Sequence, residues 1–184
     1  MNCFPFPDLT ACADVLRADI LYHRIPEGDR NALIEKAWRR GTDAAGLYIK
    51  EADGLDTLLD GFGLRIFRFD QDAVIGNQRC FAEIYPKNRR IHIYGPSVAL
   101  WAQSHGMAYA EAEPLILSHE LFHYLEYTGA VPASREIYTV PTLRIGSLVL
   151  CRSAVRAVSE IGAYAFSNAY YRSGLYPPKN ERKE

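Results

Sequence analysis

The run His119-Glu120-Leu121-Phe122-His123 places two imidazoles four residues apart and a carboxylate directly after the first of them. On an α-helix, residues four apart are rotated by about 40° and lie about 6 Å apart along the axis, so both rings can ligate one Zn²⁺ ion. Glu120 lies about 100° around the helix from His119, where it can flank the metal without binding it. A carboxylate there can act as general base toward a water molecule at the metal. The motif therefore predicts a hydrolytic zinc site.

The residues around this motif favour the helix that it needs. Pro114 suits a first helical turn, since its missing N–H would have no partner there. Gly129 follows the last periodic residue as a C-terminal stop. One face of the helix is apolar and turned away from the histidines; it consists of Leu117, Leu121, Tyr124 and Leu125. The alternative is a core helix whose histidines only form hydrogen bonds, but such a helix needs no His, Glu and His on its polar side.

A catalytic zinc site needs a third protein ligand and one open position for water. The longer pattern His-Glu-x-x-His-x-x-Gly-x-x-His is absent, because Glu126 stands at its glycine position. We favour Glu160, which lies in residues 153–171, where small and apolar side chains repeat at helical spacing. Two other carboxylates stay open: Glu126, which is better placed as a partner of a zinc-binding histidine, and Glu136, which falls in a loop. A solvent-exposed Glu160 without a metal is the remaining alternative.

The run Glu160-Ile161-Gly162-Ala163-Tyr164-Ala165-Phe166-Ser167 resembles the third-ligand helix of the ImmA/IrrE-type metallopeptidases, which are compact gluzincins. Their pattern is Glu-x-x-Ala-(Asp/Asn)-x-Phe-Ala, from which Tyr164 departs at the position of an Asp or Asn that orients a zinc-binding histidine. The resemblance covers roughly residues 60–170. It implies a zincin-like α+β fold with N-terminal helices, a small sheet of three or slightly more strands, and one zinc ion held by His119, His123 and Glu160.

Three short strands are predicted before the motif helix, at residues 64–69, 81–85 and Arg90–Tyr94, the last two joined by a hairpin turn. The first carries apolar residues on both faces, so we expect it to be covered on both sides. By resemblance, Arg90-Ile91-His92-Ile93-Tyr94 is the edge strand of the cleft, able to bind an extended peptide by main-chain pairing. His92 either faces the cleft or lies on the sheet surface, and we favour the surface.

The N-terminal third is predicted to be helical. Asp8 is expected to cap a first helix, with a stripe of Leu9, Cys12, Leu16 and Ile20. A second helix follows Pro26 and is interrupted near Gly41; both are expected on the back of the sheet. We predict one zincin-like domain over residues 1–176, with N-terminal helices in 1–55, a catalytic core in 60–176 and a flexible tail in 177–184. The loop 130–150 is expected to form a cleft wall or lid.

Composition excludes several classes of protein. The 184 residues suit one domain with a full hydrophobic core. A net charge of −1 without a basic run gives no electrostatic footprint for nucleic acid. No apolar stretch approaches the roughly 20 residues of a membrane span, and the N-terminus lacks a secretory pattern. The four cysteines are scattered without a CxxC pair, which indicates free thiols and a cytoplasmic protein.

These observations predict a zinc-dependent endopeptidase in which Glu120 takes a proton from the attacking water and passes it to the leaving amine. Tyr164 is a candidate donor to the oxyanion, with Tyr138 and His105 as alternatives, but we favour a packing role for its ring. The expected partner is a protein or peptide substrate. Family members often cleave a transcriptional repressor, so a regulatory protein on a separate chain fits the resemblance.

Two other hypotheses compete with that of a zinc-dependent endopeptidase. The first is a zinc-stabilised regulatory or interaction module of the same fold that lacks peptidase activity, which the departure at Tyr164 favours. The retained Glu120 argues against it, since a structural zinc site has no use for a general base. The second is a di-iron helical protein built on Glu120-x-x-His123. That class needs a second Glu-x-x-His, and none of the other histidines has a glutamate three residues before it.

Overall fold

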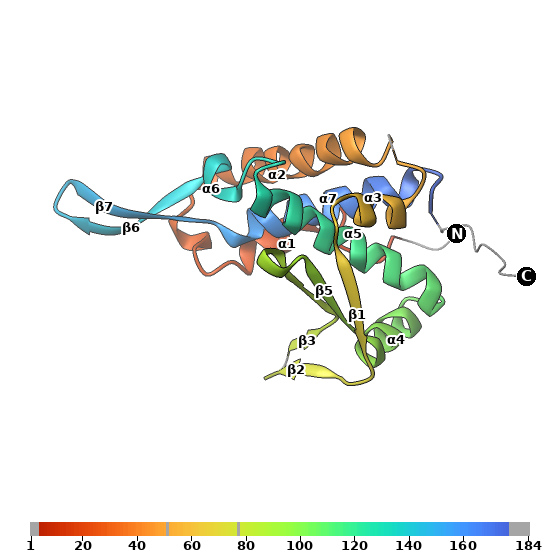
Figure 1. The fold of residues 1–184 in the computed structure, drawn as a ribbon. Helices are drawn as coiled ribbons and strands as arrows, with labels where there is room; N and C mark the ends of the chain where they lie inside the picture. Colours follow the sequence, from red (N-terminus) through yellow and green to blue (C-terminus); the bar gives the residue numbers. More distant parts are fainter. Residues whose placement is uncertain (1–3, 51, 77, 177–184) are drawn as a thin grey trace, which may run out of the picture.

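The computed structural model describes residues 4–50, 52–76 and 78–176 (Figure 1). The tail predicted at 177–184 lies outside these residues. The described elements follow in the order α1 (Cys12–Arg17), η1 (Tyr22–Arg24), α2 (Glu27–Tyr48), α3 (Leu55–Gly61), β1 (Arg65–Phe69), β2 (Ala73–Ile75), β3 (Gln78–Cys80), β4 (Ala82–Tyr85), η2 (Pro86–Asn88), β5 (Arg90–Tyr94), α4 (Gly95–Ser104), α5 (Tyr109–Thr128), α6 (Ser134–Ile137), β6 (Thr139–Ile145), β7 (Leu148–Ala154) and α7 (Arg156–Arg172). The architecture is α+β, as predicted. No helix in this part of the chain is long and apolar enough to cross a membrane.

The three predicted strands form one mixed sheet in the order β1-β5-β4. β4 and β5 are an antiparallel hairpin, and β1 pairs in parallel with the other side of β5, from Arg65 opposite Arg90 to Phe69 opposite Tyr94. The prediction that Arg90–Tyr94 is the edge strand was therefore wrong, because β5 lies in the middle and β4 is an edge. The parallel partner of β5 comes from a distant segment, which a hydrophobic pattern does not identify.

The two faces of the sheet differ in burial. Ile91 and Ile93 are fully buried in a core cluster that includes residues of α5. His92 lies between them and therefore points to the other face, where its ring centroid is 4.5 Å from that of Tyr85. Phe67 is 37% exposed on this same face, so the prediction that β1 is covered on both sides was wrong. His92 is a sheet-surface residue, the alternative that we favoured.

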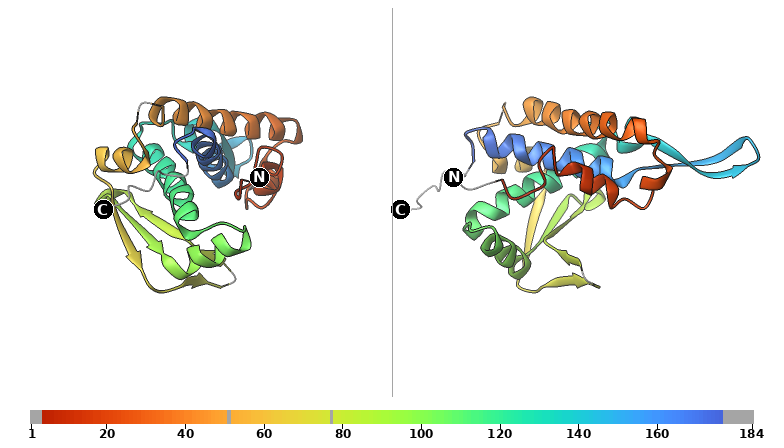
Figure 2. Two further views of the ribbon diagram at one scale, coloured as in Figure 1. Left: turned by 90° about the vertical axis from the view of Figure 1, so that its right-hand side faces the viewer. Right: turned by 180° about the vertical axis from the view of Figure 1, so that it is seen from behind.

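The N-terminal helices α1 and α2 pack against α7 rather than on the back of the sheet (Figure 1, Figure 2). The reason is that α7 is apolar on more than one side. Its residues Val158 and Ile161 form a second buried cluster with Cys12 and Leu16 of α1 and with residues of α2. α1 is shorter than predicted, and Ile20, assigned to its apolar stripe, is 85% exposed beyond its end.

α2 runs without the predicted interruption at Gly41, because this glycine serves helix packing. A Cβ atom on Gly41 would lie 2.0 Å from the carbonyl oxygen of Gly162 and 2.8 Å from Cβ of Ala165.

We expect Gly41→Ala to lower the free energy of unfolding by about 3 kcal/mol, since backbone atoms of α7 would have to shift. Gly46→Ala is the matched control in the same helix, where an added Cβ meets nothing within 4 Å. It should stabilise the chain by about 0.5–1 kcal/mol in urea denaturation. Equal effects of the two substitutions would refute this view of the helix contact.

The segment predicted as a loop at residues 130–150 contains α6 and most of the hairpin β6–β7. The hairpin extends away from the helices at one end of the molecule (Figure 1, Figure 2). It does not form the expected wall or lid. Its tip exposes apolar side chains, with Ile145 at 68% and Leu148 at 61%.

Candidate metal centre

The predicted motif lies on α5, on the face that is not packed into the core. α5 begins at Tyr109, earlier than predicted, so Pro114 lies inside the helix rather than in its first turn. The carboxylate of Glu111 accepts a hydrogen bond of 2.9 Å from the backbone N–H of Ala108, which supplies a partner at the helix start. Gly129 ends the helix with a φ of 78°, as predicted. The predicted apolar stripe is confirmed, because Leu117, Leu121, Tyr124 and Leu125 are all buried.

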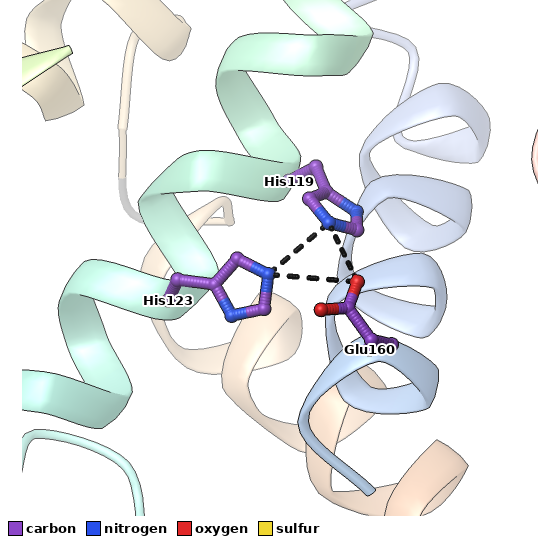
Figure 3. A group of neighbouring side chains, drawn as sticks. All are labelled: His119, His123 and Glu160. Atoms are coloured by element: carbon purple, nitrogen blue, oxygen red, sulfur yellow. Dashed lines mark hydrogen bonds and ion pairs between the residues drawn. The ribbon is translucent and has the colours of Figure 1, made fainter. Parts of the chain in front are cut away.

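α7 crosses close to α5 and brings Glu160 toward the two histidines. Gly162 makes this approach possible, since a Cβ there would lie 2.6 Å from Cζ of Phe122. The buried hydroxyls of Ser118 and Ser167 form a hydrogen bond of 2.9 Å between the two helices. Ser167 stands where the family pattern has alanine, and this contact gives its hydroxyl a partner. The crossing points Glu160 toward the two histidines (Figure 3).

His119, His123 and Glu160 converge on one point, and this group could hold a metal ion. The Nε2 atoms of the two histidines are 3.1 Å apart. Oε2 of Glu160 lies 3.4 Å from Nε2 of His119 and 3.9 Å from Nε2 of His123 (Figure 3). Ligand atoms around tetrahedral zinc, with bonds of about 2.0–2.1 Å, are about 3.3 Å apart. The three donor atoms therefore fit a zinc ion in both chemistry and spacing.

The side chain of His123 is oriented by a chain of hydrogen bonds that the sequence did not reveal. Its Nδ1 atom lies 3.1 Å from Oγ of Ser159. The Ser159 hydroxyl donates to Glu126, whose carboxylate also accepts from Nη1 of Arg40 at 3.0 Å and from the backbone N–H of Ser134. Because the hydroxyl proton of Ser159 is directed to Glu126, its oxygen accepts from Nδ1–H of His123. That tautomer leaves the lone pair of Nε2 free for a metal.

Arg40 supplies the far end of this chain from α2. It is only 8% exposed and also donates to the carbonyl oxygens of Pro132, at 2.8 Å, and Val158, at 3.1 Å. Glu126 lies outside the group of candidate ligands and reaches His123 only through Ser159. The other carboxylate left open, Glu136, accepts from the backbone N–H of Ala133 at the start of α6.

We expect Ser159→Ala to weaken zinc binding by about 10- to 100-fold, the range found when an outer partner of a metal ligand is removed. The substitution deletes the acceptor for Nδ1–H of His123 and leaves the ligand itself in place. Competition with a fluorescent zinc chelator measures the affinity. Ser153→Ala, on β7, removes a hydroxyl whose bond goes to Thr142 and should leave the affinity unchanged. Equal affinities of Ser159→Ala and the unchanged chain would contradict the orienting role.

His119 is oriented by rings instead. Its Nδ1 atom is buried and has no hydrogen-bond partner among the described residues. The Tyr164 ring stands where the family pattern has Asp or Asn, with its centroid 5.1 Å from that of His119. Phe6 also lies against both rings, at 5.5 Å from each. Burial raises the pKa of the Tyr164 phenol to about 12, so it stays protonated. The contacts of Tyr164 therefore match the packing role that we favoured.

If the chain is the peptidase that its sequence predicts, Tyr164→Phe should change peptide turnover by less than about twofold, because it keeps the ring contact and removes only the hydroxyl. Zinc content should stay the same. A loss of turnover of about 10²-fold with zinc retained would show instead that the hydroxyl stabilises the oxyanion.

The other two candidate oxyanion donors, Tyr138 and His105, have different partners. Tyr138 donates to Asp29 at 2.8 Å, and Nδ1 of His105 lies 2.8 Å from the carbonyl oxygen of Trp101.

Glu120 lines the same cleft as His119, His123 and Glu160 but is not one of these three candidate metal ligands. The cleft has a volume of about 730 Å³ and is lined by both histidines, Glu120, Glu160 and residues 81–83, at the start of β4. Burial raises the pKa of Glu120 to about 7, and Glu160 adds to this, while His119 and the backbone of Ile84 act in the opposite direction. A carboxylate with a pKa near neutrality can both accept and return a proton.

Two of the three candidate ligands, His123 and Glu160, have the protonation states that a metal needs at neutral pH. Burial, and then the charge of His119, lowers the pKa of His123 to about 4, so its imidazole is neutral. For Glu160, burial raises the pKa, but the hydrogen bond and charge of His119, together with His123 and Arg156, outweigh it and lower the pKa to about 2. Neutral imidazole and ionised carboxylate are the states that bind zinc.

The structure brings five of the predicted site residues together in one cleft: His119, Glu120, His123, Glu160 and Tyr164. It places Arg90–Tyr94 in the centre of the sheet. The sequence analysis did not identify Ser159, Arg40 and Phe6 as residues of the site. Ser159 adjoins Glu160 in sequence, which could have drawn attention to it, whereas the other two are distant along the chain. Comparisons of the chain with models of protein families, with curated proteins and with solved structures found no match.

Proposed function

We propose that the chain is a zinc-dependent endopeptidase of the compact gluzincin type, similar to the ImmA/IrrE metallopeptidases. The observation that carries the proposal is the convergence of His119, His123 and Glu160, from two helices, beside the carboxylate of Glu120, which is not one of the three candidate ligands. Zincin-like architecture, cytoplasmic location and a single zinc ion per chain belong to the same proposal. They are supported by the motif spacing and by the resemblance of residues 160–167 to the family pattern.

In this proposal His119, His123 and Glu160 hold the zinc ion, which when bound supplies Lewis acidity that lowers the pKa of water and polarises a carbonyl group. Glu120 accepts a proton from the attacking water as the new C–O bond forms. It returns that proton to the amide nitrogen as the C–N bond breaks, which balances the hydrolysis. Ser159 keeps His123 in its ligating tautomer, and the ring of Tyr164 keeps water from the outer side of His119.

The substrate is proposed to bind along β4. This strand is an edge of the sheet, and Phe81, Ala82 and Glu83 line the cleft beside the ligands. An extended peptide can add to such an edge through main-chain hydrogen bonds. β4 thus takes the role that the sequence assigned to Arg90–Tyr94. The proposed substrate is a protein or peptide, and a regulatory protein on a separate chain fits the family resemblance.

The proposal is tested by incubating the zinc-loaded chain with a mixture of unstructured peptides and identifying new termini by mass spectrometry. We expect cleavage that is lost with a chelator and restored by zinc. Glu120→Gln is the control for a contaminating peptidase. The absence of new termini, or equal cleavage by Glu120→Gln, would contradict the proposal.

One observation favours a second candidate, a zinc-stabilised interaction module without peptidase activity. It is the buried Nδ1 atom of His119, which lacks a hydrogen-bond partner in the described chain and therefore leaves one ligand less firmly oriented. This candidate predicts that zinc raises the melting temperature while no peptide is cleaved under any condition.

A further inference from the structure

Phe6 lies against the rings that border the proposed metal site. Its ring centroid is 4.9 Å from that of Trp101 and 5.5 Å from those of His119 and Tyr164. The prolines on either side of Phe6 line the same cleft as the three ligands and Glu120. The N-terminal segment therefore covers an aromatic part of the cleft lining, next to the atoms at which hydrolysis is proposed.

This segment, residues 4–7, is held by its side chains. It belongs to no helix or strand, and it forms no backbone–backbone hydrogen bond with other described residues. The chain after it is anchored independently, because Cys12 and Leu16 of α1 are buried. Few backbone contacts hold the segment, so it can leave the cleft without unfolding α1.

The segment resembles a peptide substrate in the aromatic side chain of Phe6, but its two prolines give it a different backbone. The chain bends at Pro5 and Phe6, and the Phe6 ring reaches the cleft from this bend as a side chain of a bound peptide would. Pro5 and Pro7 have no N–H, however, so they cannot donate hydrogen bonds to the edge strand β4. An ordinary peptide with an aromatic residue at the same place would keep these donors.

We propose that the surface formed by Trp101, His119 and Tyr164 is a subsite for an aromatic side chain of the substrate, and that the chain's own Phe6 fills it when substrate is absent. The inference rests on the proposed peptidase function and names its substrate class, an extended peptide with an aromatic residue beside the metal site. The N-terminal segment and the substrate exclude each other. The apparent affinity for substrate is therefore the intrinsic affinity multiplied by the fraction of molecules in which the subsite is open.

The test measures binding of two fluorescently labelled peptides, Ala-Ala-Phe-Ala-Ala and its all-alanine counterpart, to the full chain carrying Glu120→Gln, which prevents cleavage. In this background Phe6→Ala should raise the affinity for the phenylalanine peptide about tenfold or more, because the competing ring is gone. The all-alanine peptide should bind far more weakly to every variant. Phe67→Ala, at an exposed ring on the outer face of the sheet, is the matched control and should not change the affinity. Equal zinc content will verify that all variants are folded.

An unchanged or lower affinity of Phe6→Ala would overturn the inference, since Phe6 would then be a fixed wall of the cleft. Equal binding of the two peptides, or no binding of either, would also overturn it. The assay does not depend on bond cleavage. If the expected pattern appears while the chain with Glu120 cleaves nothing, the subsite stands and only the proposed peptidase function fails.

Discussion

Glu120→Gln is expected to keep its zinc and to lose about 10²- to 10⁴-fold in kcat, the usual contribution of a general base. The amide has the shape of the carboxylate but cannot take a proton from water at neutral pH. Glu120 lies in the cleft outside the ligand group, so its loss removes the base without removing a ligand. Turnover of a cleaved peptide and zinc content are measured on the same preparation.

Glu113→Gln is the matched control on the same helix, because Glu113 does not line the cleft. Its carboxylate accepts hydrogen bonds from Nε of Arg68, at 2.8 Å, and from the hydroxyl of Tyr109, at 3.0 Å. We expect its turnover to stay within a few-fold of the unchanged chain. If the two glutamine variants lose turnover equally, or if Glu120→Gln stays active, Glu120 is not the base.

Glu160→Ala is expected to lower zinc affinity by more than about 10²-fold, beyond the effect of removing an outer partner. Two imidazoles alone leave the site without its anionic ligand. Glu126→Gln is the comparison, because it keeps the side-chain volume while weakening the partner of Ser159 and Arg40. It should bind zinc within about 10- to 100-fold of the unchanged chain. Zinc retained in Glu160→Ala and lost in Glu126→Gln would show that the ligand helix was assigned wrongly.

The part of the site that lies within one helix could be predicted from sequence. The spacing of His119, Glu120 and His123 fixes their directions once α5 forms, and Gly129 marks the end of that helix. Glu160 required one further step, the expectation that a second helix crosses the first. That step came from the pattern of residues 160–167, because periodicity shows that a helix exists but not which helix it contacts.

The rest depends on contacts between distant segments. The order of the sheet is set by the pairing of β1 with β5, and both strands are too alike in composition to reveal which one is central. The Arg40–Glu126 ion pair joins residues 86 positions apart, and neither side chain differs in type from an ordinary surface charge. The sequence analysis predicted a helix break near Gly41. Sequence alone does not distinguish a glycine that allows a neighbouring helix to pack closely from a glycine that ends a helix.

The most direct test of the proposed metal centre is a crystal structure of zinc-loaded protein with anomalous diffraction measured on both sides of the zinc absorption edge. We predict one zinc peak per chain, within about 2.0–2.2 Å of Nε2 of His119, Nε2 of His123 and a carboxylate oxygen of Glu160. Glu120 should lie outside bonding distance of the peak. A zinc peak bound elsewhere, or none among these three side chains at full zinc loading, would contradict the account.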